Sequence, residues 1–161
     1  VEPDADTIVF VGDGSYLLMN SDIYSSVITD KKLIVLVLDN GGFAVINKLQ
    51  NGKGCESYNN LLKDAPTVTQ LCGVDFVQHA KSMGANAEKV SDAQALEAAF
   101  IRAKASDKTT VIVMDVDPYD GWTQEGHAWW EVGTPHVTQN PKVRAAHKDT
   151  ESGRIRQRKG V

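Results

Sequence analysis

Apolar segments of strand length recur along most of the chain. Residues 7–11, 33–38 and 109–116 consist almost entirely of apolar or β-branched residues. A continuous run of this kind, bounded by glycine, aspartate or proline, is typical of a strand buried on both faces of a parallel sheet. Residues 88–90 form a shorter strand candidate. The pattern therefore predicts three buried strands and one short strand.

The stretches between these strands place apolar residues at helical spacing. The candidate helices are residues 15–29, residues 43–49, residues 75–83 with Gly84 as a stop, and a segment capped by Ser91 or Asp92 that runs through Ala105. Residues 50–69 are rich in Asn, Gly, Lys and Pro, which predicts an irregular connection. Strands that alternate with helices in this way predict an α/β fold, an open parallel sheet with helices on both faces.

Length and composition narrow the classes of protein that remain. The chain has 161 residues, of which 42% are hydrophobic and 24% charged, as expected of one compact domain. Its longest apolar run is far too short to cross a membrane. Cys55 and Cys72 show no metal or redox spacing, which favours a reducing, cytoplasmic location. Because the chain begins at Val1 and no signal segment follows, we expect it to be a piece of a longer protein.

The net charge of −4 is unevenly spread. From Lys142 onward the chain has seven Lys/Arg and two acidic residues, which gives a net charge of +5 there and −9 for the remainder. We therefore divide the chain into an acidic α/β domain, residues 1–141, and a basic C-terminal tail, residues 142–161. An acidic body argues against nucleic-acid binding. The tail is expected to be a solvated or partner-docking terminus, with an RNA-binding arm as the alternative.

Two strand ends carry the candidate chemistry. The first strand ends in Gly12-Asp13-Gly14 and the second in Asp39-Asn40-Gly41-Gly42. Open parallel sheets bind ligands beyond the carboxyl ends of their strands, and glycine turns before helices receive phosphate. Carboxylate and amide oxygens suit Mg²⁺ or Ca²⁺ rather than zinc. The pair of motifs predicts a metal–diphosphate site, although either motif alone would be an ordinary turn.

The same pair resembles the signature of thiamine-diphosphate-binding enzymes. Gly12-Asp13-Gly14-Ser15 is followed, 28 positions after Gly12, by Asn40 in the segment LDNGGF. The resemblance implies thiamine diphosphate and Mg²⁺ as cofactors, with the metal held by Asp13, Asn40 and the carbonyl of Gly42. It implies a cofactor-binding set of Gly12, Asp13, Gly14, Ser15, Asn40, Gly42 and Phe43. One departure is that Asp39 stands where the family signature has the first of two asparagines.

Within that family, VGDGSYLLMNSDIYSSV, LIVLVLDNGGFAVINKLQ and GHAWWEV resemble hydrolases that open the ring of trihydroxycyclohexane-1,2-dione in inositol breakdown. That resemblance implies a cyclic dione substrate, C–C bond hydrolysis and a homo-oligomer, dimer or tetramer. It also implies a pyrimidine domain that supplies a glutamate to the cofactor. None of the acidic residues here is assigned that role, so no catalytic residue is named. The alternatives are an acetolactate synthase or glyoxylate carboligase type of enzyme, or a non-catalytic module that binds a phosphate-bearing ligand.

The remaining polar and aromatic residues are expected to be structural. His127, Trp129, Trp130 and the segment 119–122 follow the last strand, where they could reach a substrate but are expected to pack or to contact another subunit. His79 falls in a helix and is expected to pack there. His136 and His147 are expected at the surface. The spacing of histidines and cysteines does not indicate a zinc site, and no GxSxG motif is present.

Overall fold

The computed structural model describes residues 5–65, 67, 73–119 and 132–158. The chain divides into two compact units. The first comprises residues 1–43 and 70–118, and the second residues 44–69 and 119–161. Each unit is described by itself below.

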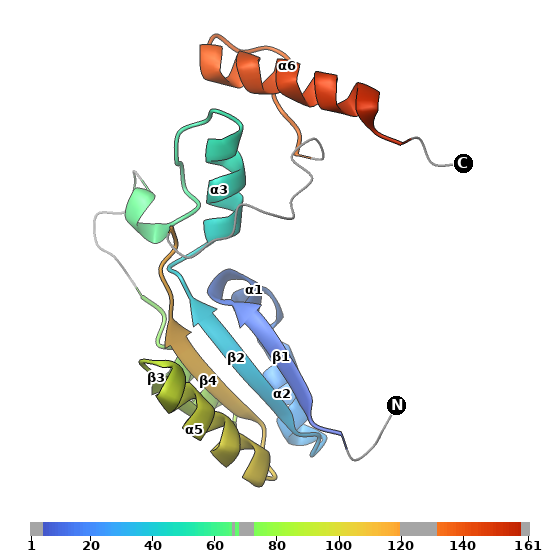
Figure 1. Cartoon of the computed structure of the whole chain (residues 1–161). Coiled ribbons are helices and arrows are strands. Elements are labelled where there is room, and N and C mark those ends of the chain that lie inside the picture. The colour runs from blue at the N-terminus through green and yellow to red at the C-terminus, as the bar shows by residue number, and fades with distance from the viewer. Residues whose placement is uncertain (1–4, 66, 68–72, 120–131, 159–161) are drawn as a thin grey trace. The chain divides into compact units, whose positions relative to one another are not determined.

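The first unit is built on a parallel sheet (Figure 1). Its strands are β1 (Thr7–Gly12), β2 (Leu33–Asp39), β3 (Asn86–Val90) and β4 (Thr110–Asp115). They lie in the order β1-β2-β4-β3, and every neighbouring pair is parallel. The predicted open parallel sheet is therefore confirmed, and the carboxyl ends of its strands share one edge.

In the described part of this unit the helices are α1 (Asp13–Met19), α2 (Ser21–Ile28), α4 (Phe76–Ser82) and α5 (Ala93–Ala105). The single helix predicted for residues 15–29 is wrong, because the helix breaks at Asn20. The side-chain amide of Asn20 donates to the backbone oxygen of Leu17 at 2.8 Å, a local bond that competes with helix continuation. Of the two N-cap candidates for α5 the structure selects Asp92, whose carboxylate accepts from the N–H of Ala95 at 2.8 Å.

Helices cover both faces of the sheet, as predicted. On one face α1, α2 and α4 bury Tyr16, Ile23 and Phe76 against the odd-numbered residues of β2 and β4. On the other face α5 buries Ala99 and Ala103 against the even-numbered residues. The alternation of faces along each strand explains the apolar runs 33–38 of β2 and 111–114 of β4, since both of their faces are covered.

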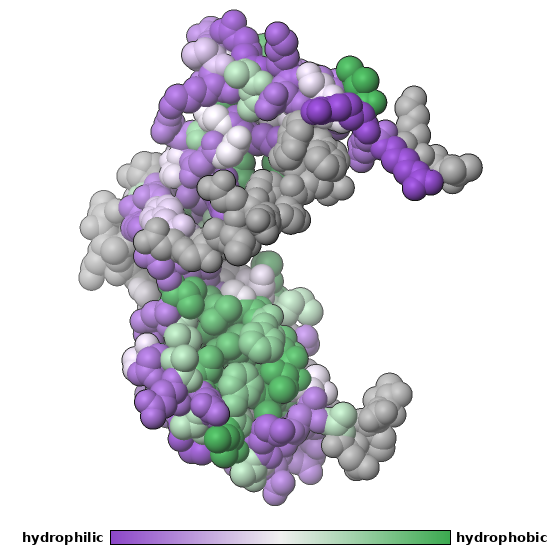
Figure 2. Space-filling model, viewed as in Figure 1, coloured by the Kyte–Doolittle hydropathy of each residue, from purple (hydrophilic) through white to green (hydrophobic). Residues whose placement is uncertain are grey.

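β1 is an exception to the predicted burial. Ile8 is 43% and Phe10 67% exposed, although the composition of residues 7–11 is that of a buried strand. Among the described residues β1 pairs with β2 alone, so it forms one edge of the sheet. α5 packs mainly on β2, β3 and β4, and it reaches β1 through the ring of Phe100, whose centroid lies 6.4 Å from that of Phe10. Figure 2 shows apolar side chains gathered on this face of the first unit.

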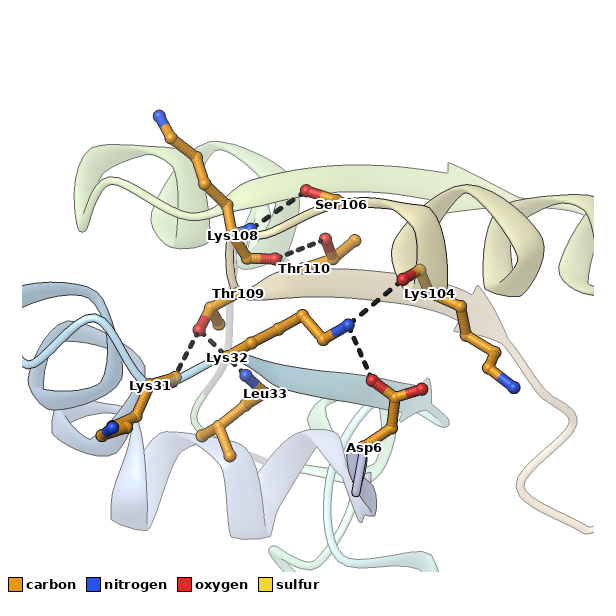
Figure 3. Close-up of polar contacts among 9 residues, drawn as sticks. All are labelled: Asp6, Lys31, Lys32, Leu33, Lys104, Ser106, Lys108, Thr109 and Thr110. Carbon is orange, nitrogen blue, oxygen red and sulfur yellow. Dashed lines mark hydrogen bonds and ion pairs between the residues drawn. The ribbon is translucent and has the colours of Figure 1, made fainter. Parts of the chain in front are cut away.

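Polar contacts tie the strands together at the opposite, amino-terminal edge of the sheet (Figure 3). The hydroxyl of Thr109, a residue only 3% exposed, accepts from the N–H of Leu33 at 3.1 Å and lies 2.8 Å from the hydroxyl of Ser26. Lys32 pairs with Asp6 at 2.6 Å and donates to the backbone oxygen of Lys104 at 3.2 Å. These contacts stabilise the end of the sheet that lies away from the predicted site.

The second unit contains α3 (Ala44–Gly52), the 3₁₀ turn η1 (Leu62–Asp64) and α6 (Pro141–Arg156). α3 extends to Gly52, beyond the predicted helix 43–49, and the turn η1 follows it within the described part of the predicted connection. Most of the basic tail forms α6, to which the spacing of apolar residues assigned no element. Gly54 packs against the backbone of Lys142, and the ammonium of Lys53 lies 3.1 Å from the buried hydroxyl of Thr150. The boundary between residues 141 and 142 stays a prediction.

None of the helices described has the length and apolar character needed to cross a membrane.

Candidate metal and diphosphate site

The first two strands bring the two predicted motifs together. β1 pairs with β2 in parallel, with Gly12 opposite Leu38, so the residues that follow the two strands lie at the same edge of the sheet. The backbone N–H of Asn40 points to Asp13 Oδ1 at 3.5 Å. Asp13 and Asn40 are 27 residues apart in the chain, and the parallel pairing of their strands makes them neighbours in space.

The side chain of Asn40 lies between Asp13 and Gly42. One of its two terminal amide atoms is 2.8 Å from the backbone oxygen of Gly42 and 3.1 Å from Asp13 Oδ1. When that atom is the nitrogen, it donates a hydrogen bond to each oxygen; when it is the amide oxygen, three oxygen atoms converge with no hydrogen between them. A 180° rotation of the amide group exchanges its nitrogen and oxygen. Which of the two atoms faces Asp13 and Gly42 therefore depends on whether a cation is bound there.

Three converging oxygens fit a hard divalent cation. Oxygen ligands of Mg²⁺ lie at about 2.1 Å from the metal in octahedral geometry, so neighbouring ligands are about 3 Å apart. The separations of 2.8 and 3.1 Å agree with that spacing. A carboxylate, an amide and a backbone carbonyl are also the donor types that Mg²⁺ accepts. Among the described residues, no three His, Cys, Asp or Glu side chains gather as metal ligands, so any metal held at this edge would rely on these mixed oxygens.

The carboxyl of Asp13 is buried, with an exposed fraction of 5%. Burial raises its pKa above the ordinary value, the N–H of Asn40 opposes that shift, and the nearby carboxylate of Asp39 adds to it. A buried carboxylate that is held near other negative charge gains from a cation in contact with it. The electrostatics at this strand end therefore favour the same class of ligand as the geometry.

The turn after β2 has a fixed conformation. Gly41 has a φ of +78°, in the left-handed region that glycine adopts without a steric cost. Oδ1 of Asp39 accepts a hydrogen bond from the N–H of Gly41 at 3.0 Å. This bond was not anticipated, since Asp39 stood out only as a departure from the family signature. The signal was present in the sequence, because aspartate two residues before glycine is typical of an Asx turn.

Gly14 and Phe43 are in contact. A Cβ atom added to Gly14 would lie 2.5 Å from Cε1 of Phe43, closer than any normal carbon contact. The absence of a side chain at Gly14 thus makes room for the Phe43 ring, and the contact of Gly14 with a ligand stays a prediction. An added Cβ at Gly12 would meet no atom within 4 Å, and Ser15 is exposed, so both could accept a ligand.

A hydrogen bond and an aromatic contact join α1 to α4. The hydroxyl of Tyr16 lies 3.0 Å from Nδ1 of His79, and the ring of Tyr16 packs edge-on to that of Phe76 with centroids 5.4 Å apart. This contact agrees with the structural role expected for His79. It fixes the helix that begins at Asp13 against α4.

The other aromatic and histidine candidates lie in the second unit. Tyr119 donates from its hydroxyl to Asp64 at 2.9 Å. His136 is exposed, as expected, whereas His147 is half-buried and its ring lies 4.9 Å from that of His136. Residues 120–122, His127, Trp129, Trp130 and Cys72 lie outside the described residues.

Comparison with known proteins gives a family. The model of the thiamine pyrophosphate enzyme C-terminal TPP-binding domain matches residues 1–114. A 3D-(3,5/4)-trihydroxycyclohexane-1,2-dione hydrolase of Lacticaseibacillus casei is 35% identical over 152 residues, which is 94% of this chain and 23% of that protein. The enzyme of the same name from Bacillus subtilis is 34% identical over 149 residues, 92% of this chain and 23% of that protein. The chain thus spans about a quarter of the length of these relatives.

Solved structures share the fold. A thiamine diphosphate-dependent 4-hydroxybenzoylformate decarboxylase of Rhodococcus jostii RHA1 superimposes with a TM-score of 0.60 at 23% identity, covering 72% of this chain and 20% of that one. Benzoylformate decarboxylase from Polynucleobacter necessarius gives 0.57 at 25% identity, covering 71% of this chain and 20% of that one. The match to the family model and the 35% identical relative establish the family, and the solved structures agree with it in fold. The chain belongs to the thiamine pyrophosphate enzyme family, as its C-terminal cofactor-binding domain.

Proposed function

We propose that this chain holds Mg²⁺ and the diphosphate of thiamine diphosphate in an enzyme that opens the ring of a trihydroxycyclohexane-1,2-dione by C–C bond hydrolysis. The observation that carries the metal assignment is the convergence of Asp13, the Asn40 amide and the Gly42 carbonyl at separations of 2.8 and 3.1 Å. The substrate is taken from relatives that are about 35% identical to this chain over an alignment that spans nearly all of it.

Each residue of the site has a separate task in this proposal. Asp13 and the amide oxygen of Asn40 bind the cation through their side chains, and Gly42 binds it through its backbone oxygen. The backbone N–H groups of the turn from Gly12 to Ser15 face the diphosphate. Phe43 packs on Gly14 and thereby keeps the two turns in register. Bound thiamine diphosphate supplies a nucleophilic carbon for attack on a carbonyl group, so the protein's contribution is binding and orientation.

The rest of the active site belongs to polypeptide beyond this chain. The relatives are about four times as long, since the match covers 23% of each. A pyrimidine domain with its glutamate, the dione-binding surface and a dimeric or tetrameric assembly in the cytoplasm are therefore part of the proposal for the complete enzyme. No residue of this chain is assigned as the acid or base of the reaction.

Calorimetric titration of the chain with thiamine diphosphate tests the metal assignment. The wild type should bind in the presence of Mg²⁺ and lose binding when EDTA replaces the metal. Asp13→Asn keeps the volume but removes the charge of the ligand, and should weaken Mg²⁺-dependent binding at least about tenfold. The matched control is Asp22→Asn, because Asp22 is exposed on α2 and should leave binding unchanged. Equal affinity of the Asp13 variant and the wild type would refute the assignment.

The substrate requires the complete enzyme. A full-length protein that contains this domain should open the dione ring in a reaction that needs both thiamine diphosphate and Mg²⁺, and Asn40→Ala should abolish that activity. Retained cofactor binding with no turnover of the dione would leave the domain assignment intact and reject the substrate.

A further inference from the structure

Asp39 stands at the end of β2, directly before Asn40, where the family signature has an asparagine. Its carboxylate accepts the N–H of Gly41 at 3.0 Å, and its backbone oxygen accepts the N–H of Val116 at 2.8 Å. These two bonds fix the backbone on either side of the Asn40 side chain. Asp39 thus shapes the turn that presents Asn40 and Gly42 without being one of the proposed ligands.

Negative charge accumulates along this edge of the sheet. Asp39 and Asp115 are register partners at the ends of β2 and β4, and Asp13 follows β1. On β3 the ammonium group of Lys89 is paired with Asp115 at 2.8 Å. Among the described strand ends one ammonium faces three carboxylates, so the charges of Asp13 and Asp39 are not fully balanced there.

This imbalance has opposite effects with and without a cation. Like charges on neighbouring strand ends repel, and Asp13 and Asp39 directly follow the register partners Gly12 and Leu38 of β1 and β2. A divalent ion in contact with Asp13 replaces that repulsion with attraction to both carboxylates.

We propose that Asp39 is a positioning residue that raises the affinity of the Asp13–Asn40–Gly42 site for a divalent cation, through its negative charge and its hold on the Gly41 amide. The inference rests on the proposed function, because it takes those three residues as the ligands. It assigns to the departure from the family signature a role in metal binding.

Three variants separate charge from geometry. Asp39→Asn keeps an oxygen that can accept the Gly41 N–H but removes the charge, whereas Asp39→Ala removes both. Asp22→Asn is the control, because it removes an exposed carboxylate of α2 and leaves the strand ends and the Gly41 turn unchanged. Two measurements are made on each protein. The first is the affinity for Mg²⁺, from calorimetric titration at saturating thiamine diphosphate, and the second is the melting temperature without metal.

The expected result is a Mg²⁺ affinity about five- to tenfold weaker for Asp39→Asn, weaker still for Asp39→Ala, and within about twofold of wild type for Asp22→Asn. Without metal, Asp39→Asn should melt about 2 °C higher than wild type, because repulsion with Asp13 is relieved. A purely structural role would lower that melting temperature. Unchanged Mg²⁺ affinity or a lower metal-free melting temperature in Asp39→Asn would overturn the inference. Absence of Mg²⁺-dependent binding in the wild type would refute the proposed function as well.

Discussion

Substituting Gly14 by alanine tests the contact that joins the two turns of the site. The added Cβ would lie 2.5 Å from Cε1, 2.8 Å from Cδ1 and 3.1 Å from Cζ of Phe43. Carbon atoms in contact are normally about 3.5–4.0 Å apart, so the ring has to retreat by about 1 Å. Phe43 is 46% exposed, which allows its ring to turn toward solvent.

The magnitude follows from two opposing effects. Overpacking costs about 1–3 kcal/mol, and replacing glycine by alanine in a helix returns up to about 1 kcal/mol. We therefore expect Gly14→Ala to lower the free energy of unfolding by about 1 kcal/mol. In a Phe43→Ala background the clash is absent, and the same substitution should be neutral or slightly stabilising. The coupling energy between the two positions should then be about 1–2 kcal/mol.

Urea unfolding of the wild type, both single variants and the double variant, followed by circular dichroism, measures that coupling. Mg²⁺-dependent binding of thiamine diphosphate should be weaker in Gly14→Ala, because displacement of Phe43 pulls on the neighbouring Gly42 carbonyl, and should partly recover in the double variant. Additive effects within about 0.5 kcal/mol would show that the Gly14–Phe43 contact does not constrain the site.

Three further predictions concern the scaffold. Thr109→Val removes the hydroxyl that bonds Ser26 and the N–H of Leu33, and should cost about 1–3 kcal/mol in urea unfolding; an unchanged midpoint would contradict the role of Thr109. Gly54→Ala should cost at least about 2 kcal/mol, since φ is +82° and the new Cβ would lie 2.6 Å from the backbone of Lys142. Burial raises the pKa of Tyr16 to about 12 from 10.0. The unfolded chain therefore releases this proton first, and stability should fall as the pH rises from about 10 to about 12. After discounting for solvent screening, the free energy of unfolding of Tyr16→Phe should fall by about 1–2 kcal/mol less than that of the wild type over that range.

The alternation of strands and helices could be predicted because both faces of β2 and β4 are covered. Strands covered on both faces have continuous apolar runs, which are easily recognised in a sequence. The two strand-end motifs were readable for the same reason: in a parallel sheet the carboxyl ends of paired strands meet at one edge. The exposure of β1 could not be predicted, because it depends on strand order and on which strands α5 covers. The same apolar composition would suit a central strand.

Local hydrogen bonds and distant contacts account for the other differences. The break at Asn20 depends on one side-chain bond to Leu17, which the apolar spacing of residues 15–29 does not encode. Gly14 faces Phe43, a neighbour 29 positions away that only the fold reveals. α6 buries Val143, Thr150 and Gly153, too few apolar residues to produce a helical pattern in a strongly basic segment.

Crystals of the chain grown with Mn²⁺ and thiamine diphosphate would locate the cation directly by anomalous scattering. We predict one strong peak at this edge of the sheet, about 2.2 Å from an Asp13 carboxylate oxygen, the Asn40 amide oxygen and the Gly42 backbone oxygen. A peak bound elsewhere, or an Asn40 amide that keeps its nitrogen toward Asp13 while the cofactor is bound, would contradict the metal site.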